Sequence, residues 1–239
     1  MKVKQILSKM INVAEDTMFP HYVCPFCGAE TPDGVVCNEC NKSLITPSFC
    51  EKCGEHVGEN ARVCMECKEI ERLFDRSLSV FKYENSIAAA IKRFKFNGAK
   101  YLAEDFAMLL AAKFNSINID VDIITCVPST QKNIKERGYN QAAEMAKHFA
   151  EIVNLPFAEV LLKTKETPHQ IDLTKQQRLK NLAGSFSVVD KWLVKNKSIL
   201  IIDDVFTTGS TMSACAKVIK KAGANKVYCF TLAKTALIN

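Results

Sequence analysis

The stretch Ser198-Ile-Leu-Ile-Ile-Asp-Asp-Val-Phe-Thr-Thr-Gly-Ser-Thr-Met212 decides the fold. Its four consecutive apolar residues, 199–202, are too few to cross a membrane and are typical of a strand buried on both faces of a parallel sheet. Two adjacent carboxylates, Asp203 and Asp204, follow directly, and a loop of small and hydroxyl residues then leads into a helical pattern. This order predicts an α/β fold with a ligand site at the carboxyl end of the strand.

The loop after the two acids favours a phosphate group. A helix N-terminus attracts anions because its first N–H groups are unpaired and its dipole is positive there. The acids do not suit that anion, but they suit the hydroxyls of an attached sugar, or a Mg²⁺ ion. A Walker A loop is excluded because no Gly-Lys-Ser/Thr sequence ends the loop. The pattern predicts a phosphorylated ribose, and the alternative is a plain strand-to-helix turn with the acids as surface caps. The candidate phosphate residues are Thr207, Thr208, Gly209, Ser210 and Thr211.

Residues 203–211 resemble the phosphoribosyl pyrophosphate (PRPP) fingerprint of type I phosphoribosyltransferases. The resemblance implies a central, mainly parallel sheet that binds PRPP together with Mg²⁺. It also implies that Asp203 and Asp204 are the catalytic pair, which holds the ribose hydroxyls and favours the positive charge developing on the sugar. The loop 207–211 would anchor the 5′-phosphate.

Two further segments are expected at the same edge of the sheet. A buried strand over 121–127 ends in the turn Pro128-Ser129-Thr130, where the resembling family receives pyrophosphate. Arg137 offers a planar donor for phosphate, or else it is a surface residue at a helix start. The polar stretch 163–181 is expected to be either a basic lid over the ligand or a solvated hairpin. The lid candidates are Lys163, Gln170 and Arg178.

Eight of the eleven cysteines form four Cys-x-x-Cys pairs between residues 24 and 67. This spacing predicts two structural Zn²⁺ sites in a double zinc ribbon, because the segment has too few large apolar residues to fold unaided. Disulfides do not suit a cytoplasmic chain, whereas a cross-braced pairing of the four pairs stays open. In sequential pairing the ligands are Cys24, Cys27, Cys37 and Cys40 for one site, and Cys50, Cys53, Cys64 and Cys67 for the other.

The 239 residues are enough for one α/β domain with a small attachment. We expect an amphipathic helix over 1–20, the double zinc ribbon over 21–72 and a phosphoribosyltransferase-like domain over 73–239. The later domain should alternate strands at 77–83, 121–127, 160–162, 185–189, 199–202 and 227–233 with helices at 86–96, 100–114, 140–152 and 211–222. Ser86 is the expected N-cap of the first of these helices.

The composition is that of an ordinary soluble protein. No apolar run approaches the roughly 18 residues that span a bilayer, and the N-terminus lacks the unbroken apolar core of a signal peptide. We therefore expect a cytoplasmic protein without a transmembrane segment. The net charge of +6 suits polyanions, which include phosphorylated metabolites as well as nucleic acid.

Over its whole length the chain resembles the ComF family, whose members are ComFC-like and GntX-like proteins. The resemblance is carried by Met18-Phe-Pro20, Tyr83, Ile91-Lys-Arg-Phe-Lys-Phe96, Gly98, Arg137-Gly-Tyr-Asn-Gln141, Gln170, Arg178, Asn181 and Phe186. It implies a cytoplasmic protein of natural transformation that handles incoming single-stranded DNA, with a DNA-uptake helicase or channel as partner. Two functions are open: a phosphoribosyltransferase whose acceptor is unknown, or a non-catalytic single-stranded nucleic-acid-binding module that keeps PRPP binding as a sensor or relic.

Overall fold

The computed structural model of the chain describes residues 23–31, 35–45, 50–55, 57, 61–165 and 184–235. The helix expected over 1–20 and the lid candidates Gln170 and Arg178 lie outside the described residues. Every helix in the described part of the chain is too short or too polar to cross a membrane.

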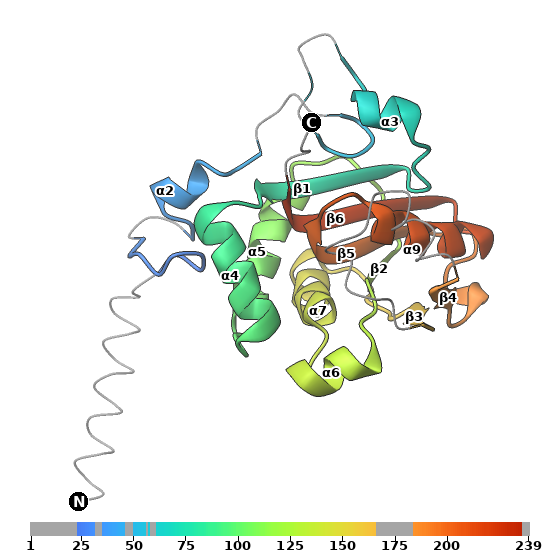
Figure 1. Ribbon diagram of the computed structural model, residues 1–239. Helices are drawn as coiled ribbons and strands as arrows, with labels where there is room; N and C mark the ends of the chain where they lie inside the picture. Colours follow the sequence, from blue (N-terminus) through green and yellow to red (C-terminus); the bar gives the residue numbers. More distant parts are fainter. Residues whose placement is uncertain are drawn as a thin grey trace, which may run out of the picture.

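The apolar run 199–202 lies in an inner strand of a four-stranded parallel sheet (Figure 1). The strand order is β1-β6-β5-β2, and Leu200 of β5 is flanked by Ile124 on one side and Tyr228 on the other. Neighbours on both edges and helices on both faces bury this strand, which confirms the prediction from its continuous apolar sequence. The strands are β1 (Arg76–Lys82), β2 (Ile123–Cys126), β5 (Ser198–Phe206) and β6 (Lys226–Lys234).

Helices cover both faces of the sheet, and alternate residues of β5 face the two layers. Leu200 and Ile202 belong to the core beneath the first helical layer, whereas Ile199 and Ile201 belong to the core beneath α9. The first layer comprises α4 (Asn85–Phe96), α5 (Leu102–Phe114) and α7 (Gln141–Val153). The second layer is α9 (Ser210–Lys221), and the short helix α6 (Gln131–Arg137) precedes α7.

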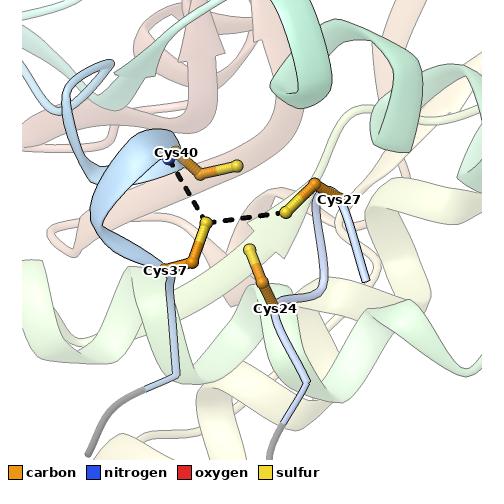
Figure 2. Close-up of side chains that lie close together, drawn as sticks. All are labelled: Cys24, Cys27, Cys37 and Cys40. Carbon is orange, nitrogen blue, oxygen red and sulfur yellow. Dashed lines mark hydrogen bonds between the residues drawn. The ribbon is translucent and has the colours of Figure 1, made fainter. Parts of the chain in front are cut away.

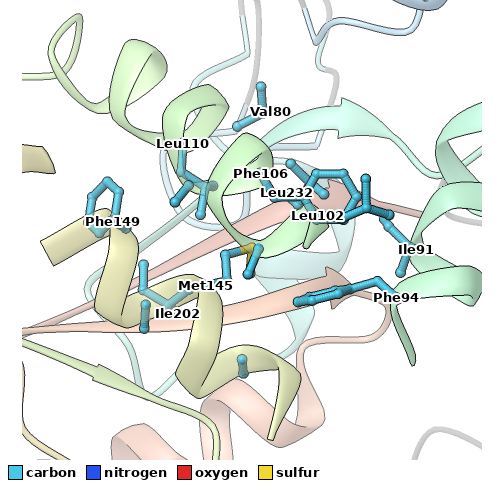
Figure 3. Packing of buried hydrophobic residues seen from close by; sticks show 14 of the residues in the cluster. Val80, Ile91, Phe94, Leu102, Phe106, Leu110, Met145, Phe149, Ile202 and Leu232 are labelled. Atoms are coloured by element: carbon cyan, nitrogen blue, oxygen red, sulfur yellow. The ribbon is translucent and has the colours of Figure 1, made fainter. Parts of the chain in front are cut away.

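The larger core lies between β5, β6 and the layer of α4, α5 and α7 (Figure 3). Phe106 and Leu110 of α5 and Met145 and Phe149 of α7 are fully buried there with Ile202 of β5. Each such side chain contributes about 1.5–3 kcal/mol by leaving water. The two helices are thereby fixed against the strand that carries the acid pair.

Two local expectations are wrong. Ser86 does not cap α4, because the helix begins one residue earlier, with Glu84 at the N-cap and Asn85 at a φ of 45°. The Glu84 carboxylate instead accepts a hydrogen bond from the Ser43 hydroxyl (3.0 Å). The strands expected at 160–162 and 185–189 do not join the sheet. They form β3 (Leu161–Lys163) and β4 (Phe186–Val188), which pair antiparallel with each other. The short 3₁₀ helix η2 (Lys191–Leu193) follows β4.

The cysteine-rich segment packs against the outer edge of β1. The backbone N–H of Ile45 donates to the Val80 carbonyl (2.9 Å), and the N–H of Ser77 donates to the Lys52 carbonyl (2.7 Å). An exposed edge strand invites pairing with other chains, and here the polypeptide itself covers that edge. The segment contains the short helices α2 (Asn38–Asn41) and α3 (Met65–Glu69).

Apolar contacts also join the cysteine-rich segment to the sheet. The Phe26 ring lies 4.9 Å from the Phe81 ring of β1 and 5.7 Å from the Phe106 ring of α5, measured between centroids. The Arg93 side chain of α4 donates to the Phe26 carbonyl (3.0 Å). Residues on both sides of position 72 therefore share one core, and the division of the chain at residues 20 and 72 stays a prediction.

Candidate functional site

A pocket of about 360 Å³ opens where β2 and β5 end. It brings together candidates from four separate segments of the sequence: the acid pair with the loop 207–211 that follows it (here called the phosphate loop), the turn after β2, the end of α6 and the end of β3. The predicted residues that line it are Pro128, Ser129, Arg137, Lys163, Asp203, Asp204, Thr207 and Thr211. The sequence indicated no role in this pocket for several other residues that line it, namely Tyr83, Lys95, Asn133, Asn140 and Gln141.

Both acids lie within β5 rather than after it, because the strand continues to Phe206 in register with β6. Asp204 is only 2% exposed, and both of its carboxylate oxygens have partners. The Lys95 ammonium lies 2.7 Å from Oδ1, and the Gln141 amide donates to Oδ2 (3.2 Å). Asp204 therefore ties β5 to α4 and α7, which excludes the interpretation of this acid as a surface cap.

The neighbouring acid has a different environment. Burial, and secondly the negative charge of Asp204, raise the pKa of Asp203 to about 7, although the Lys95 charge opposes the shift. Burial acts to lower the pKa of Lys95, but Asp204 and Asp203 outweigh it and raise that pKa. Near neutral pH the Asp203 carboxyl can therefore exchange a proton while Lys95 stays charged. Such a carboxyl can either accept from or donate to a sugar hydroxyl.

The phosphate loop is built around a glycine that no other residue can replace without strain. Gly209 is the N-cap of α9 and has a φ of 71°. A Cβ at this position would lie 2.4 Å from Cζ of Phe206 and 2.9 Å from Nη1 of Arg72. Glycine also has no side chain with which to cap the first turn of α9, an arrangement that suits an anion.

The hydroxyls of this loop divide between the pocket and the loop itself. Thr207 and Thr211 line the pocket, whereas Thr208 and Ser210 are paired with each other through their hydroxyl oxygens at 2.9 Å. Thr208, Gly209 and Ser210 are not among the lining residues. The N–H of Ser210 also donates to Oγ1 of Thr208 (3.4 Å), so any contact of this part of the loop with an anion would be through the N–H groups of Thr208 and Gly209.

The turn after β2 places two of its three candidates in the pocket. Pro128 and Ser129 line it, but Thr130 is the N-cap of α6 and accepts from the N–H of Asn133 (3.1 Å). The Asn140 amide donates to the Val127 carbonyl (3.1 Å), which fixes the start of the turn relative to α7.

Arg137 is at the end of α6 rather than at a helix start, and it faces the pocket. Its guanidinium lies 4.9 Å from the centre of the Phe96 ring, and its Nη1 donates to Gln141 Oε1 (3.2 Å). Gln141 thus contacts both Arg137 and Asp204. Arg137 was a candidate by its chemistry, whereas Lys95 and Gln141 stood out only as parts of segments that carry the family resemblance. The sequence contained no signal that either residue would pair with Asp204.

The eight cysteines form two clusters in the sequential pairing, and the cross-braced alternative is wrong. The four sulfur atoms of each cluster lie within 4.8 Å of one another, with Cys27 and Cys37 3.5 Å apart and Cys53 and Cys64 3.7 Å apart. Figure 2 shows the four side chains of the first cluster turned toward a common point. Tetrahedral ligands at about 2.3 Å from Zn²⁺ are about 3.8 Å apart, so both clusters fit the metal.

The environment of Cys37 also suits metal binding. A hydrogen bond from the Cys40 backbone N–H (3.5 Å) is the main cause that lowers the pKa of Cys37 to about 7. Metals bind the thiolate form. The three cysteines outside the clusters, Cys126, Cys215 and Cys229, are buried core residues.

A parallel sheet with a Thr-Gly-Ser-Thr loop at the acidic strand end, preceded by two four-cysteine sites, defines a phosphoribosyltransferase-type protein with zinc ribbons. The phosphoribosyl transferase domain family matches residues 100–236, and the double zinc ribbon domain family matches residues 14–68. The chain belongs to the ComF family of type I phosphoribosyltransferase-fold proteins.

Three curated relatives cover most of the chain. Competence protein F of Haemophilus influenzae is 27% identical over 83% of this chain and 90% of its own length. DNA utilization protein YhgH of Escherichia coli K12 is 25% identical over 84% of this chain and 90% of its own length. Competence protein ComFC of Streptococcus pneumoniae is 25% identical over 84% and 89%.

Two similar solved structures have a lower sequence identity to this chain. The allosteric regulatory enzyme of purine biosynthesis is 20% identical over 54% of this chain, with a TM-score of 0.38, and the match spans 25% of that enzyme. The adenine phosphoribosyl transferase of Trypanosoma brucei is 14% identical over 58% of this chain and 67% of its own, with a TM-score of 0.37.

Proposed function

We propose that this chain binds PRPP, together with Mg²⁺, in the pocket at the ends of β2 and β5. The observation that carries the proposal is the convergence in that one pocket of Asp203, Thr207, Ser129, Arg137 and Lys163. The carboxyl suits sugar hydroxyls, and the hydroxyl and basic groups on either side of it suit phosphates. PRPP carries both kinds of group.

The proposed roles follow from the chemistry of each side chain. The carboxyl of Asp203 binds the ribose hydroxyls, and the loop 207–211 binds the 5′-phosphate through its N-terminal N–H groups and the hydroxyls of Thr207 and Thr211. Arg137 and the turn at Pro128 and Ser129 bind the pyrophosphate. Mg²⁺ would neutralise part of the pyrophosphate charge.

In phosphoribosyl transfer, the bond from the anomeric carbon to the pyrophosphate oxygen breaks, and pyrophosphate leaves with the bonding electrons. An acceptor supplies the electron pair of the new bond. Positive charge develops on the sugar between these events. The negative charges of Asp204 and of ionised Asp203 would stabilise that positive charge. Catalysis of this kind rests on positioning and electrostatics and needs no protein nucleophile.

The cellular role proposed is DNA uptake at the cytoplasmic side of the membrane. It is supported by relatives named competence protein F, competence protein ComFC and DNA utilization protein. A helicase or channel of the uptake machinery is the proposed protein partner, and single-stranded DNA the proposed nucleic acid.

Calorimetric titration of zinc-loaded protein with PRPP and Mg²⁺ tests the binding site. Wild type should bind, and Asp203→Asn and Asp203→Asn/Asp204→Asn should lose most of the affinity. The matched control is Glu104→Gln/Asp105→Asn, which removes an adjacent acidic pair at the start of α5, outside the pocket residues. Absence of binding to well-folded wild type would sink the proposal.

A second candidate function is the binding of single-stranded nucleic acid without catalysis. It is favoured by Trp192, which is 65% exposed, with the ammonium groups of Lys191 and Lys195 at 5.2 and 4.8 Å from its ring. Exposed aromatic rings with cations can stack bases and bind phosphates. Trp192 is the only tryptophan in the chain, so quenching of its fluorescence by an oligothymidylate, lost at high salt, would support this function. Unchanged fluorescence would count against this surface.

A further inference from the structure

We propose that Arg72 couples the second zinc site to the phosphate loop and so positions that loop for its ligand. The inference rests on the proposed function for the identity of the ligand, but the contact itself does not. Arg72 is a positioning residue in this account, because it touches the loop from behind and is not among the residues that line the pocket.

The Arg72 side chain contacts the second metal site on one side. Its Nη2 lies 2.9 Å from the Glu66 carboxylate, and the two side chains are 3% and 10% exposed. Glu66 belongs to α3, the short helix that begins directly after Cys64 and includes Cys67. Glu66 therefore holds the guanidinium beside a helix whose N-cap is Cys64 and which includes Cys67, two of the four cysteines of the second site.

On its other side the same guanidinium contacts the phosphate loop. Nη1 donates to the Thr208 carbonyl at 2.6 Å, across 136 residues of sequence. Carbonyl and N–H of one peptide point in opposite directions, so this bond aims the N–H of Gly209 away from Arg72. The close approach of Nη1 also explains why position 209 has no room for a Cβ.

A second contact joins the same zinc ribbon to the loop. The buried Lys234 ammonium donates to the Cys53 carbonyl (3.0 Å) and lies 3.3 Å from the Glu55 carboxylate. It also lies 4.4 Å from the centre of the Phe206 ring, which directly precedes the phosphate loop and which a Cβ at position 209 would meet. Arg72 therefore supports the phosphate loop directly and Lys234 supports it through Phe206, and both cations contact the second zinc ribbon.

These contacts imply that metal binding and ligand binding are coupled. The metal-binding segment has few large apolar residues, so its geometry depends on zinc. When the four cysteines are held together, Glu66 and the Cys53 carbonyl hold Arg72 and Lys234 in place. The loop is then preorganised for an anion, and ligand affinity gains because less ordering is required on binding. Coupling between two sites is reciprocal, so the ligand must also raise the affinity of the second site for zinc.

The test compares Arg72→Met and Arg72→Lys with Arg62→Met in the full-length, zinc-loaded protein. Arg62 is a matched control, since it pairs with Glu51 in the same ribbon (2.8 Å) but its side chain is 83% exposed. We expect Arg72→Met to weaken PRPP binding about 10- to 100-fold, the effect of losing a charge-assisted hydrogen bond. Hydrogen exchange of residues 207–211 should speed up about tenfold or more even without ligand. Arg72→Lys should recover part of both effects.

The reciprocal measurement is zinc transfer to a chromogenic chelator. At equilibrium, PRPP should reduce the transfer of about half of the zinc from wild type and from Arg62→Met, but not from Arg72→Met. Wild-type loop exchange in Arg72→Met, together with a wild-type effect of PRPP on its zinc transfer, would overturn the inference. If wild type itself does not bind PRPP, the proposed function fails, and loop exchange in zinc-loaded and zinc-free protein still decides whether Arg72 couples the two sites. If Arg72→Met does not fold, Arg72→Lys and zinc removal from wild type supply the same comparison.

Discussion

The buried ion pair between Lys95 and Asp204 gives a prediction with a definite magnitude. Its partners are 2.7 Å apart, with side chains 24% and 3% exposed. Removing one member of a buried pair typically costs about 3–5 kcal/mol, because the other charge stays buried and unpaired. We expect Lys95→Met to destabilise the protein by about 3 kcal/mol, the lower end of that range, because Gln141 still donates to Asp204.

The double-mutant cycle isolates the interaction. Asp204→Asn alone should cost less, about 1–2 kcal/mol, because the Lys95 ammonium can turn toward the solvent in the pocket. Lys95→Met/Asp204→Asn removes both charges, and the coupling energy should be about 2 kcal/mol. The assay is equilibrium unfolding of zinc-loaded protein in urea at pH 7, with unchanged m-values as the condition for comparison.

The control is Lys100 with Glu144, a pair of 3.1 Å whose side chains are 57% and 19% exposed. Its coupling energy should stay below about 1 kcal/mol, as for other solvated pairs. A coupling energy for Lys95 and Asp204 no larger than that of the control would refute the reasoning that burial makes this pair matter.

Three further outcomes are expected. The pKa of Asp203 is raised to about 7, so its contribution to stability is full below its unfolded pKa of about 4 and is lost as the pH rises through 7. Urea unfolding should therefore show that wild type loses stability relative to Asp203→Asn between pH 5 and pH 8. Parallel stability curves for the two proteins would contradict this. Gly209→Ala should cost more than about 1 kcal/mol of stability, because of the positive φ at this position and the contacts of the added Cβ with Phe206 and Arg72. The control is Gly98→Ala, which has the same kind of φ but no atom within 4 Å of the added Cβ, and both are measured from the urea midpoint. Chelation of zinc should lower the thermal midpoint and expose apolar surface, since the ribbons cover β1 and share its core; an unchanged midpoint in calorimetry would show that the sheet stands alone.

The fold and part of the candidate site could be predicted because their signals are local. The apolar run, the acid pair and the loop that follows lie within fifteen consecutive residues, and strand, turn and helix form there by short-range rules. The cysteine spacing is local in the same sense, and the sequential pairing is confirmed.

The rest depends on contacts between distant segments. Lys95 is on α4 and Gln141 on α7, and nothing in either segment indicates that both meet Asp204. Arg72 is separated from Thr208 by 136 residues. It comes shortly after the last cysteine pair, and nothing in the sequence distinguishes it from other basic residues. Ser86 fails as a cap for a related reason, because Ser43 binds Glu84 and the helix begins before Ser86.

The cover on the outer edge of β1 has a consequence for synthesis of the chain. The inner neighbour of β1 is β6, and Ser79 and Thr231, which hydrogen-bond across these strands, are 152 residues apart. At ordinary elongation rates β1 leaves the ribosome on the order of 10 to 30 s before β6 can pair with it. The zinc ribbons, made just before β1, are the partner available to the nascent strand in that interval. We therefore expect zinc supply during translation to determine how much of the newly made chain has the outer edge of β1 covered while the inner edge is still waiting for β6.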